Sequence, residues 1–277
     1  MTSYMECEKV IVSLTTIPSR VAFLAETIES LLSQTYRPCS IELNIPDVYR
    51  KRDLGSINLA KLPDSISVFK CEDFGPATKL LPTLSRYRGQ NVVIIYCDDD
   101  RIYEKNMIAR LVNCHRDNPR TAVAEEVVEI KSRFYSHIYK KDWGYRMRRV
   151  FSAGYWKPNR NNPSKGQIVQ GFGGVLVRPD FFPMKTFEVD DEFFMVDDIW
   201  FSAMLAKENV KVRFSERTTA EKSSPVIVNG QDLGRFSESL VASVHHGLTR
   251  NDLDWRAIRL ARERYGVWKN EVDELLC

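Results

Sequence analysis

The first 120 residues alternate between two hydrophobic patterns. Short runs rich in β-branched residues predict buried strands, and stretches with apolar residues three or four positions apart predict helices. On this basis we expect strands at 10–14, 41–45, 66–69 and 92–96. We expect helices at 22–34, 77–87 and 105–117. Strands that alternate with helices predict an α/β fold, with a mixed, mostly parallel central sheet flanked by helices.

The pattern is less regular after residue 120. The predicted elements are a strand at 121–130, a loop that enters a strand at 169–177, a helix at 199–208, a strand at 210–214, a turn-rich loop at 223–234 and a terminal helix at 252–275. The sequence contains no internal repeat, low-complexity segment or convincing linker. We therefore expect a single domain, 1–277, whose two halves are about 1–120 and about 121–277.

Composition narrows the class of protein without identifying it. The chain has 277 residues, of which 43% are hydrophobic and 28% charged, as in an ordinary globular protein with a sizeable core. Its net charge of +3 is too small to indicate nucleic-acid binding by itself. The apolar runs are shorter than a membrane span, and the first residues lack the regions of a signal peptide. Since the six cysteines form no C-x-x-C pair and no N-x-[ST] site occurs, we expect a cytoplasmic protein.

The most informative segment is an apolar strand that runs into three consecutive carboxylates. Residues 92–96 predict a buried parallel strand, and Asp98, Asp99 and Asp100 follow its carboxyl end. Ligands of open α/β sheets bind at that end of the strands. Adjacent acids repel one another unless a cation or hydrogen-bond donors compensate, and bound Mg²⁺ or Mn²⁺ often also holds substrate phosphates. The triplet therefore predicts either a metal–phosphate site or a solvated acidic turn.

Three other segments carry chemically useful residues. Asp197 and Asp198 stand at a predicted helix start, where acids also serve as caps and interact with the helix dipole. The glycine-rich loop 171–174 allows close approach of the backbone to a ligand, or simply forms a tight turn. Segment 131–165 contains ten Lys or Arg, one acid and eight aromatic residues. That composition fits a surface for sugars, for an anionic membrane or for single-stranded nucleic acid, and equally an ordinary solvated insertion.

These segments follow one another in an informative order. Residues 12–20, the acidic triplet, the 171–174 loop, the acidic step 196–198 and a late histidine succeed one another along nearly the whole chain. In this order they resemble a GT-A glycosyltransferase. The segment Leu-Leu-Ser-Gln-Thr-Tyr-Arg-Pro at 31–38 is similar to the inverting family-2 type. The resemblance implies a GT-A type nucleotide-binding fold and a nucleotide-sugar donor.

The same resemblance implies a metal site. The D-x-D-type acids of the family hold a metal ion and the donor ribose, so the Mn²⁺ or Mg²⁺ contact falls mainly to Asp100. Asp98 or Asp99 would contact the ribose or support the metal, and the resemblance makes Asp98 a candidate for a second metal ligand. In many GT-A enzymes a late histidine completes the site, which implicates His245 or His246. The alternative for these histidines is a surface or core position.

The resemblance also assigns the loops around the donor. The family has its nucleobase beside the loops that follow the first and third strands, and its donor sugar beside the glycine-rich loop. The residues at these positions are Thr15, Arg20, Asp73, Lys79, Gly173 and Gly174. An Asp73 carboxylate that accepts the uracil imide N–H would select a uridine nucleotide, and the Lys79 ammonium would approach phosphate. The alternative for both is loop capping and a solvated helix charge.

Catalysis and acceptor binding follow from the acidic step. An acceptor hydroxyl that attacks the anomeric carbon must lose a proton, and a carboxylate within reach acts as the general base. The resemblance assigns this role to Asp198 and an acceptor-hydroxyl contact to Asp197. Within this hypothesis the basic aromatic segment binds the acceptor, through residues such as Arg146, Arg148 and Trp156.

The predicted function is therefore metal-dependent transfer of a sugar from a nucleotide-sugar, UDP-linked, to a glycan or lipid-linked acceptor in polysaccharide or lipopolysaccharide synthesis. Segment 131–165 could then touch the membrane surface peripherally, and no nucleic-acid partner is expected. One alternative is a sugar nucleotidyltransferase, but that class usually has a glycine-rich loop after its first strand, and residues 15–20 contain no glycine. The other is a non-catalytic glycan- or nucleic-acid-binding protein, against which the retained acids argue.

Overall fold

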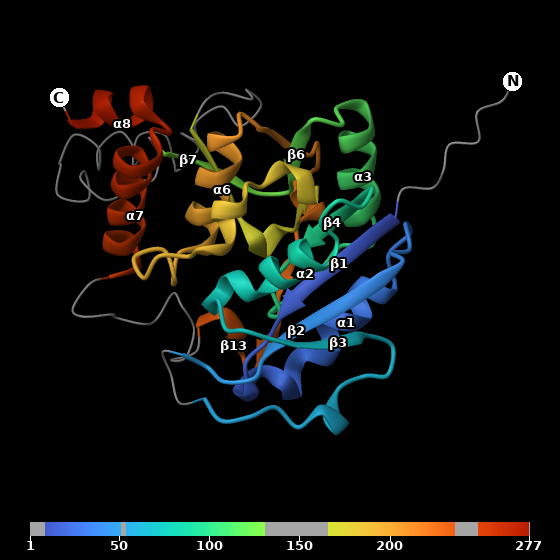
Figure 1. The fold of residues 1–277 in the computed structure, drawn as a ribbon. Coiled ribbons are helices and arrows are strands. Elements are labelled where there is room, and N and C mark those ends of the chain that lie inside the picture. The colour runs from blue at the N-terminus through green and yellow to red at the C-terminus, as the bar shows by residue number, and fades with distance from the viewer. Residues whose placement is uncertain (1–8, 51–53, 131–165, 236–248, 277) are drawn as a thin grey trace, which may run out of the picture.

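The computed structural model describes residues 9–50, 54–130, 166–235 and 249–276 (Figure 1). The strands of its central sheet are β1 (Lys9–Thr15), β2 (Ser40–Pro46), β3 (Ser67–Cys71), β4 (Val92–Tyr96), β6 (Thr121–Ala124), β9 (Val175–Val177) and β10 (Lys211–Phe214). Among the described residues these seven strands lie in the order β10-β6-β9-β4-β1-β2-β3. Neighbouring strands are parallel except at β9, which is antiparallel to both β4 and β6. The predicted mixed, mostly parallel sheet is confirmed.

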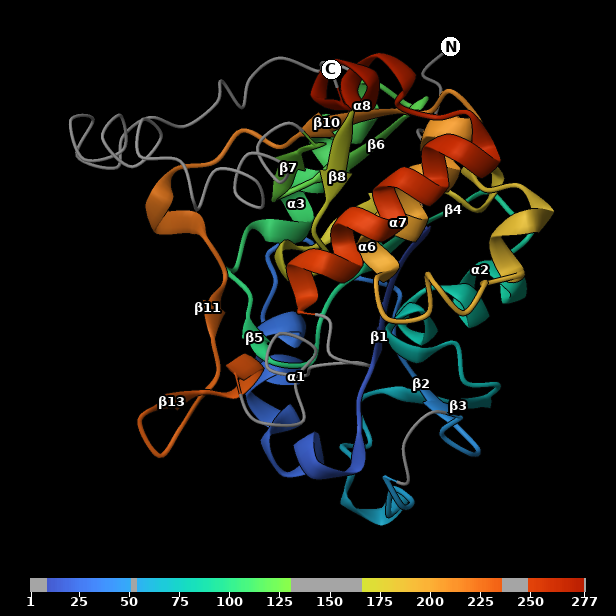
Figure 2. The ribbon, with the colours of Figure 1, turned by 90° about the vertical axis from the view of Figure 1, so that its left-hand side faces the viewer.

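Helices cover both faces of this sheet, as expected. The α-helices are α1 (Leu24–Leu32), α2 (Leu81–Arg86), α3 (Met107–Asp117), α6 (Asp197–Lys207), α7 (Arg250–Tyr265) and α8 (Lys269–Leu276). Helices α1 and α3 pack on one face, and α2, α6 and α7 pack on the other. Figure 2 shows α7 lying along α6 on the outside of that second layer. No helix in the described ranges is long and apolar enough to cross a membrane.

Alternation along the central strand produces the two core layers. On β4, Ile94 and Tyr96 point toward α6, whereas Val93 and Ile95 point toward α1 and α3. All four side chains are fully buried. A strand covered on both faces is apolar at every position, which explains the unbroken hydrophobic run in the sequence.

Shorter elements connect these layers. Three two-stranded pairs form from β5 (Arg101–Ile102) with β11 (Ser224–Pro225), β7 (Val127–Glu129) with β8 (Gln167–Val169), and β12 (Ile227–Val228) with β13 (Gln231–Asp232). The short 3-10 helices are η1 (Pro18–Phe23), η2 (Leu59–Lys61), η3 (Gly75–Lys79), η5 (Gly171–Gly173), η6 (Pro179–Phe181), η7 (Met184–Phe187), η8 (Thr219–Glu221) and η9 (Leu233–Arg235). The loop expected at 223–234 therefore contains β11, β12 and β13.

The strand predicted at 121–130 is wrong as a single element. It divides into β6 and β7, which belong to different sheets. The division falls at Glu125, a buried acid whose carboxylate accepts hydrogen bonds from Arg110 at 3.1 Å and from Ser215 at 2.6 Å and forms an ion pair with Arg217 at 3.1 Å. These partners come from α3 and from the loop after β10. The chain thus leaves the central sheet at a residue whose carboxylate is paired with arginine side chains.

The terminal helix predicted at 252–275 is also two elements. Helix α7 begins at Arg250, where the Thr249 hydroxyl accepts the Asp252 backbone N–H in a capping box. It ends at Tyr265 because Gly266 takes a left-handed conformation, with φ of +68°. That conformation is easy for glycine and stops a helix. Helix α8 then starts a new direction at Lys269.

Topology brings the candidate residues to one edge of the sheet. Strands β1 to β4 run parallel, so their carboxyl ends meet there: Thr15 ends β1, Asp73 lies on the loop after β3, and Asp98–Asp100 follow β4. Strand β9 runs the other way, so its preceding loop, 170–174, reaches the same edge. The fold thus gathers residues that are up to 159 positions apart in the sequence, from Thr15 to Gly174.

Candidate active site

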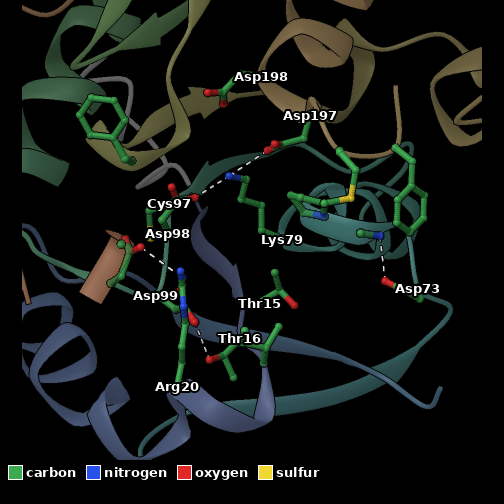
Figure 3. A pocket seen from close by; sticks show the side chains of 18 of the residues that line it. Thr15, Thr16, Arg20, Asp73, Lys79, Cys97, Asp98, Asp99, Asp197 and Asp198 are labelled. Atoms are coloured by element: carbon green, nitrogen blue, oxygen red, sulfur yellow. Dashed lines mark hydrogen bonds and ion pairs between the residues drawn. The ribbon is translucent and has the colours of Figure 1, made fainter. Parts of the chain in front are cut away.

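A cavity of about 690 Å³ opens at this edge of the sheet. The loops after β1, β3 and β4 form one side of it, and the loop before β9 and the starts of α6 and α7 form the other. Figure 3 shows Asp98 and Asp197 on either side of the Lys79 ammonium, with Asp198 on the side of Asp197. The two acidic motifs of the sequence therefore line one cavity.

Both carboxylate oxygens and the backbone carbonyl of Asp99 accept hydrogen bonds that hold the loop after β4. Its carboxylate accepts hydrogen bonds from the Thr16 hydroxyl at 2.5 Å and from Arg20 Nη1 at 2.7 Å. Its backbone carbonyl accepts the Thr27 hydroxyl at 2.9 Å. Asp99 is buried. The central acid of the triplet thus ties β4 to the loop after β1, and Arg20 acts through it rather than pointing freely into the cavity.

Lys79 connects the two acidic motifs. Its Nζ lies 2.5 Å from Asp98 Oδ1 and 2.9 Å from Asp197 Oδ2. Burial alone would lower the pKa of Lys79, but the charges of Asp197 and Asp98 raise it well above its ordinary value, so the ammonium stays charged. The lysine predicted to approach phosphate already has two carboxylate partners.

Asp100 is the third acid of the triplet and lies beside Asp98 and Asp99. One of its oxygens lies 3.1 Å from Arg20 Nη1. Burial, followed by the charges of Asp98 and Asp99, nevertheless raises its pKa to about 7. A divalent cation would relieve this repulsion.

The oxygen ligands available here fit Mg²⁺ or Mn²⁺. No group of three His, Cys, Asp or Glu side chains converges on one metal position within the described ranges. Mg²⁺ does not require such a group, because it often takes one or two carboxylates, several waters and substrate phosphates. Asp98 and Asp100 each engage one oxygen with Lys79 or Arg20 and carry a second oxygen. These two acids would hold the ion, which would stabilise negative charge on a diphosphate.

Asp197 and Asp198 occupy the first two positions of α6, but their side chains do not cap it. The N-cap residue is Val196, and within the described residues this helix start has no side-chain cap hydrogen bond. Asp198 Oδ1 instead accepts the Gly171 backbone N–H at 2.9 Å. Burial, followed by the charge of Asp197, raises the pKa of Asp198 to about 7. Such a carboxylate accepts a proton readily near neutral pH.

Gly171 is the glycine of the 171–174 loop that touches the acidic residues. A Cβ there would lie 2.6 Å from Lys79 Nζ and 3.4 Å from Asp198 Oδ1. A Cβ on Gly173 would instead meet Glu126, and one on Gly174 would meet Met107. The two glycines predicted to bind the donor therefore pack against the protein, and Gly171 is the one beside the acids.

The loop after β3 is organised around Asp73. Its two carboxylate oxygens accept the backbone N–H groups of Arg50 at 2.7 Å and of Gly75 at 2.8 Å. Asp73 still lines the cavity, as does Thr15, whose hydroxyl donates to the Asn44 carbonyl. The loop-capping alternative thus has direct support for Asp73, while a contact to a nucleobase stays a prediction.

Some cavity residues have no obvious sequence signal. Phe194 and Met195 project from the loop before α6, and Arg250 at the start of α7 donates a 2.6 Å hydrogen bond to the Met195 carbonyl. No local sequence pattern predicts this hydrogen bond, because Arg250 and Met195 are 55 positions apart. Thr16 could have been found from its position next to Thr15. The candidates Arg146, Arg148, Trp156, His245 and His246 lie outside the described residues.

Comparison with known proteins gives structural neighbours but no sequence relatives. No family model matches the chain, and no curated protein matches it in sequence. The mannosyltransferase PcManGT from Pyrobaculum calidifontis, in complex with GDP-Man and Mn²⁺, aligns at 15% identity over 95% of this chain and 76% of that one, with a TM-score of 0.46. TarS 1–349 from S. aureus, in complex with UDP, aligns at 12% identity over 97% and 69%, with a TM-score of 0.50. The likeness to TarS shows a common fold.

Proposed function

We propose that this protein is a glycosyltransferase that moves a sugar from a nucleotide-sugar to an acceptor hydroxyl. The observation that supports it best is the meeting of two acidic motifs in one cavity, at the carboxyl edge of a mostly parallel sheet. One motif suits a metal and a diphosphate, and the other contains a carboxylate whose pKa suits a general base. The cavity therefore offers one acidic motif for the leaving diphosphate and another for the attacking hydroxyl.

The proposed donor is a UDP-sugar. TarS, which shares the fold, is in complex with UDP. The nucleotide would lie against the loops after β1 and β3, near Thr15 and Asp73. A carboxylate has about four lone-pair sites, so Asp73 can accept a uracil N–H in addition to its two backbone bonds. The diphosphate would then reach Asp98 and Asp100, where a bound Mn²⁺ or Mg²⁺ supplies positive charge.

The proposed reaction is a single displacement. Asp198 takes the proton from the acceptor hydroxyl as the acceptor oxygen bonds to the anomeric carbon. The bond between that carbon and the diphosphate oxygen breaks, and its electron pair leaves with the nucleoside diphosphate. Attack from the face opposite the leaving group inverts the anomeric configuration. Asp197, held by Lys79 beside the base, would contact the acceptor hydroxyl.

The acceptor in this proposal is a glycan or a lipid-linked glycan of polysaccharide or lipopolysaccharide synthesis. It would enter on the side of Phe194, Met195 and Arg250, which line the cavity next to Asp197. Aromatic rings and arginine suit sugar faces and anionic groups. The basic segment 131–165 is proposed to extend this surface.

A thermal-shift screen followed by a turnover assay tests the proposal. UDP-, GDP-, CMP- and dTDP-sugars are compared with and without Mn²⁺. A ligand at about 100 times its Kd raises the free energy of unfolding by about 2.7 kcal/mol, which gives a clear rise in Tm. We expect UDP-sugars with Mn²⁺ to give the largest rise and slow release of UDP. Absence of any rise and of any turnover with all four classes would refute the proposal.

A further inference from the structure

Lys79 holds an unusual position for a charged side chain. The residue is 5% exposed, although lysine is rarely buried without compensation. Its ammonium contacts Asp98 after β4 and Asp197 at the start of α6, and these residues are 99 positions apart. One cation therefore joins the two halves of the cavity.

The backbone of Lys79 is fixed independently of its charge. Its carbonyl accepts the Ser13 hydroxyl at 2.6 Å. The Ser13 oxygen in turn lies 2.7 Å from the Thr83 hydroxyl and accepts an Asn44 N–H at 3.1 Å. These three polar residues are fully buried on β1, α2 and β2. The lysine thus projects from an anchored point, so its ammonium reaches a defined place.

The space for the ammonium depends on Gly171. This glycine does not have the positive φ that would require glycine. Gly171 matters here because it has no side chain, and a Cβ at this position would lie 2.6 Å from Lys79 Nζ. Its backbone N–H meanwhile holds Asp198 Oδ1 at 2.9 Å. Gly171 therefore contacts the lysine with one part of its backbone and the proposed base with another.

We propose that Lys79 and Gly171 form a positioning unit, in which the ammonium seated against Gly171 holds Asp197 beside Asp98 while the Gly171 N–H orients Asp198. This inference rests on the proposed glycosyltransferase function and concerns how its catalytic carboxylates are set. In this role Lys79 acts through Asp197 and does not bind phosphate. Asp98, the donor-side acid, and Asp197, the acceptor-side acid, then keep a fixed separation.

The charge arrangement agrees with this role. Among the described residues, the Lys79 ammonium pairs with Asp98 and Asp197 and also feels the charge of Asp198, so these three acids retain negative charge for a metal or a proton to neutralise. A phosphate ligand would need an ammonium free to turn toward the donor. Lys79 Nζ is committed to carboxylates on both sides, as the two dashed lines in Figure 3 show.

Two variants test the unit from opposite sides. Lys79→Met removes the charge and keeps most of the side-chain length. Gly171→Ala keeps every charge and displaces Nζ, which is the end of a flexible side chain, so that the fold should survive. Each is assayed for UDP affinity by calorimetry with Mn²⁺ and for kcat of UDP release from the UDP-sugar that the wild type turns over. Lys185→Met, which removes an exposed lysine paired with Glu188, is the control.

We expect kcat to fall about 100-fold in Lys79→Met and at least about tenfold in Gly171→Ala, because small misplacements of catalytic groups are costly. UDP affinity should change less than about threefold in both. In an Asp197→Asn background, Lys79→Met should cost far less than it does alone, since residues that act as a unit are not additive.

Other results would overturn the inference. A parallel loss of UDP affinity and kcat in Lys79→Met would make the lysine a donor ligand. Independent, multiplicative losses in the double variant would separate it from Asp197. If Lys79→Met does not fold, Gly171→Ala decides alone, and an unchanged kcat refutes the unit. Absence of turnover in the wild type with every donor would instead refute the proposed function, so the two failures can be distinguished.

Discussion

Replacing Asp198 with asparagine tests the proposed chemistry most directly. Asparagine has nearly the same shape, and its side-chain oxygen can still accept the Gly171 N–H now held at 2.9 Å. The substitution removes only the ability to take a proton. Because the residue makes no cap bond to α6, the helix start should persist.

The expected magnitude follows from the role of the residue. Loss of a general base costs about 10²–10⁴-fold in rate, or about 3–5 kcal/mol of transition-state stabilisation. Stability should move little. Loss of a charge near the helix dipole costs about 0.3–1 kcal/mol. Burial and the charge of Asp197 raise the pKa of Asp198 from 3.8 to about 7, so the wild type loses stability from this group as pH rises through that window. Asparagine does not ionise, so the variant avoids this loss of stability. At pH 8 that gain offsets the cost of removing a charge near the helix dipole.

The assay measures kcat for UDP release at saturating UDP-sugar and Mn²⁺, together with UDP affinity and Tm. The wild-type kcat should fall about tenfold for each pH unit below about 7, because the base must be ionised. The variant should have low activity and lack this acidic limb. Asp197→Asn is the matched control for the adjacent position, where we expect a smaller loss.

Four results would refute the reasoning. Normal kcat in Asp198→Asn would remove the residue from catalysis, and collapse in Asp197→Asn alone would move the base by one position. A drop in Tm with normal activity of the folded fraction would make Asp198 a structural residue. Loss of UDP affinity would assign it to the donor site.

The remaining predictions concern the donor side and the fold. UDP affinity should fall at least about tenfold in EDTA or in Asp100→Asn, and equal affinity in EDTA would contradict a metal role. Because burial and neighbouring acids raise the pKa of Asp100 to about 7 and an ionised carboxylate is needed to bind metal, Mn²⁺-dependent affinity should weaken below that pH. Arg20→Met removes the cation that pairs with the buried Asp99 and the partly buried Asp100, and should lower the free energy of urea unfolding by about 3 kcal/mol, less where solvent screens the charges. An unchanged free energy would mean that the two acids are already solvated. Gly266→Ala should cost about 1–2 kcal/mol at its φ of +68°, and an unchanged Tm would show that the helix end relaxes.

Prediction from the sequence succeeded where a local pattern carries the information. An apolar β-branched run such as 92–96 predicts a strand buried on both faces, and the alternation of strands and helices predicts a parallel sheet. Parallel strands end at one edge, so acids after β4 could be assigned to that edge without coordinates. A local signal was also present at Gly266, but the apolar spacing beyond it favoured one long helix.

The side-chain partners required the tertiary structure. Lys79 meets Asp197 across 118 positions, and Asp198 meets the Gly171 N–H across 27. Glu125, at the break between β6 and β7, pairs with Arg110 and Arg217, which come from other elements.

The sequence by itself therefore determined the strands and helices of the first 120 residues and the edge of the sheet at which the acids after β4 lie, because periodicity and strand direction are local properties. Only the tertiary structure decided which of the acids pair with Lys79 and Arg20. Pairing depends on charges that long-range packing brings together, whereas burial, followed by the charges of acids adjacent in sequence, raises the pKa values of Asp100 and Asp198 to about 7.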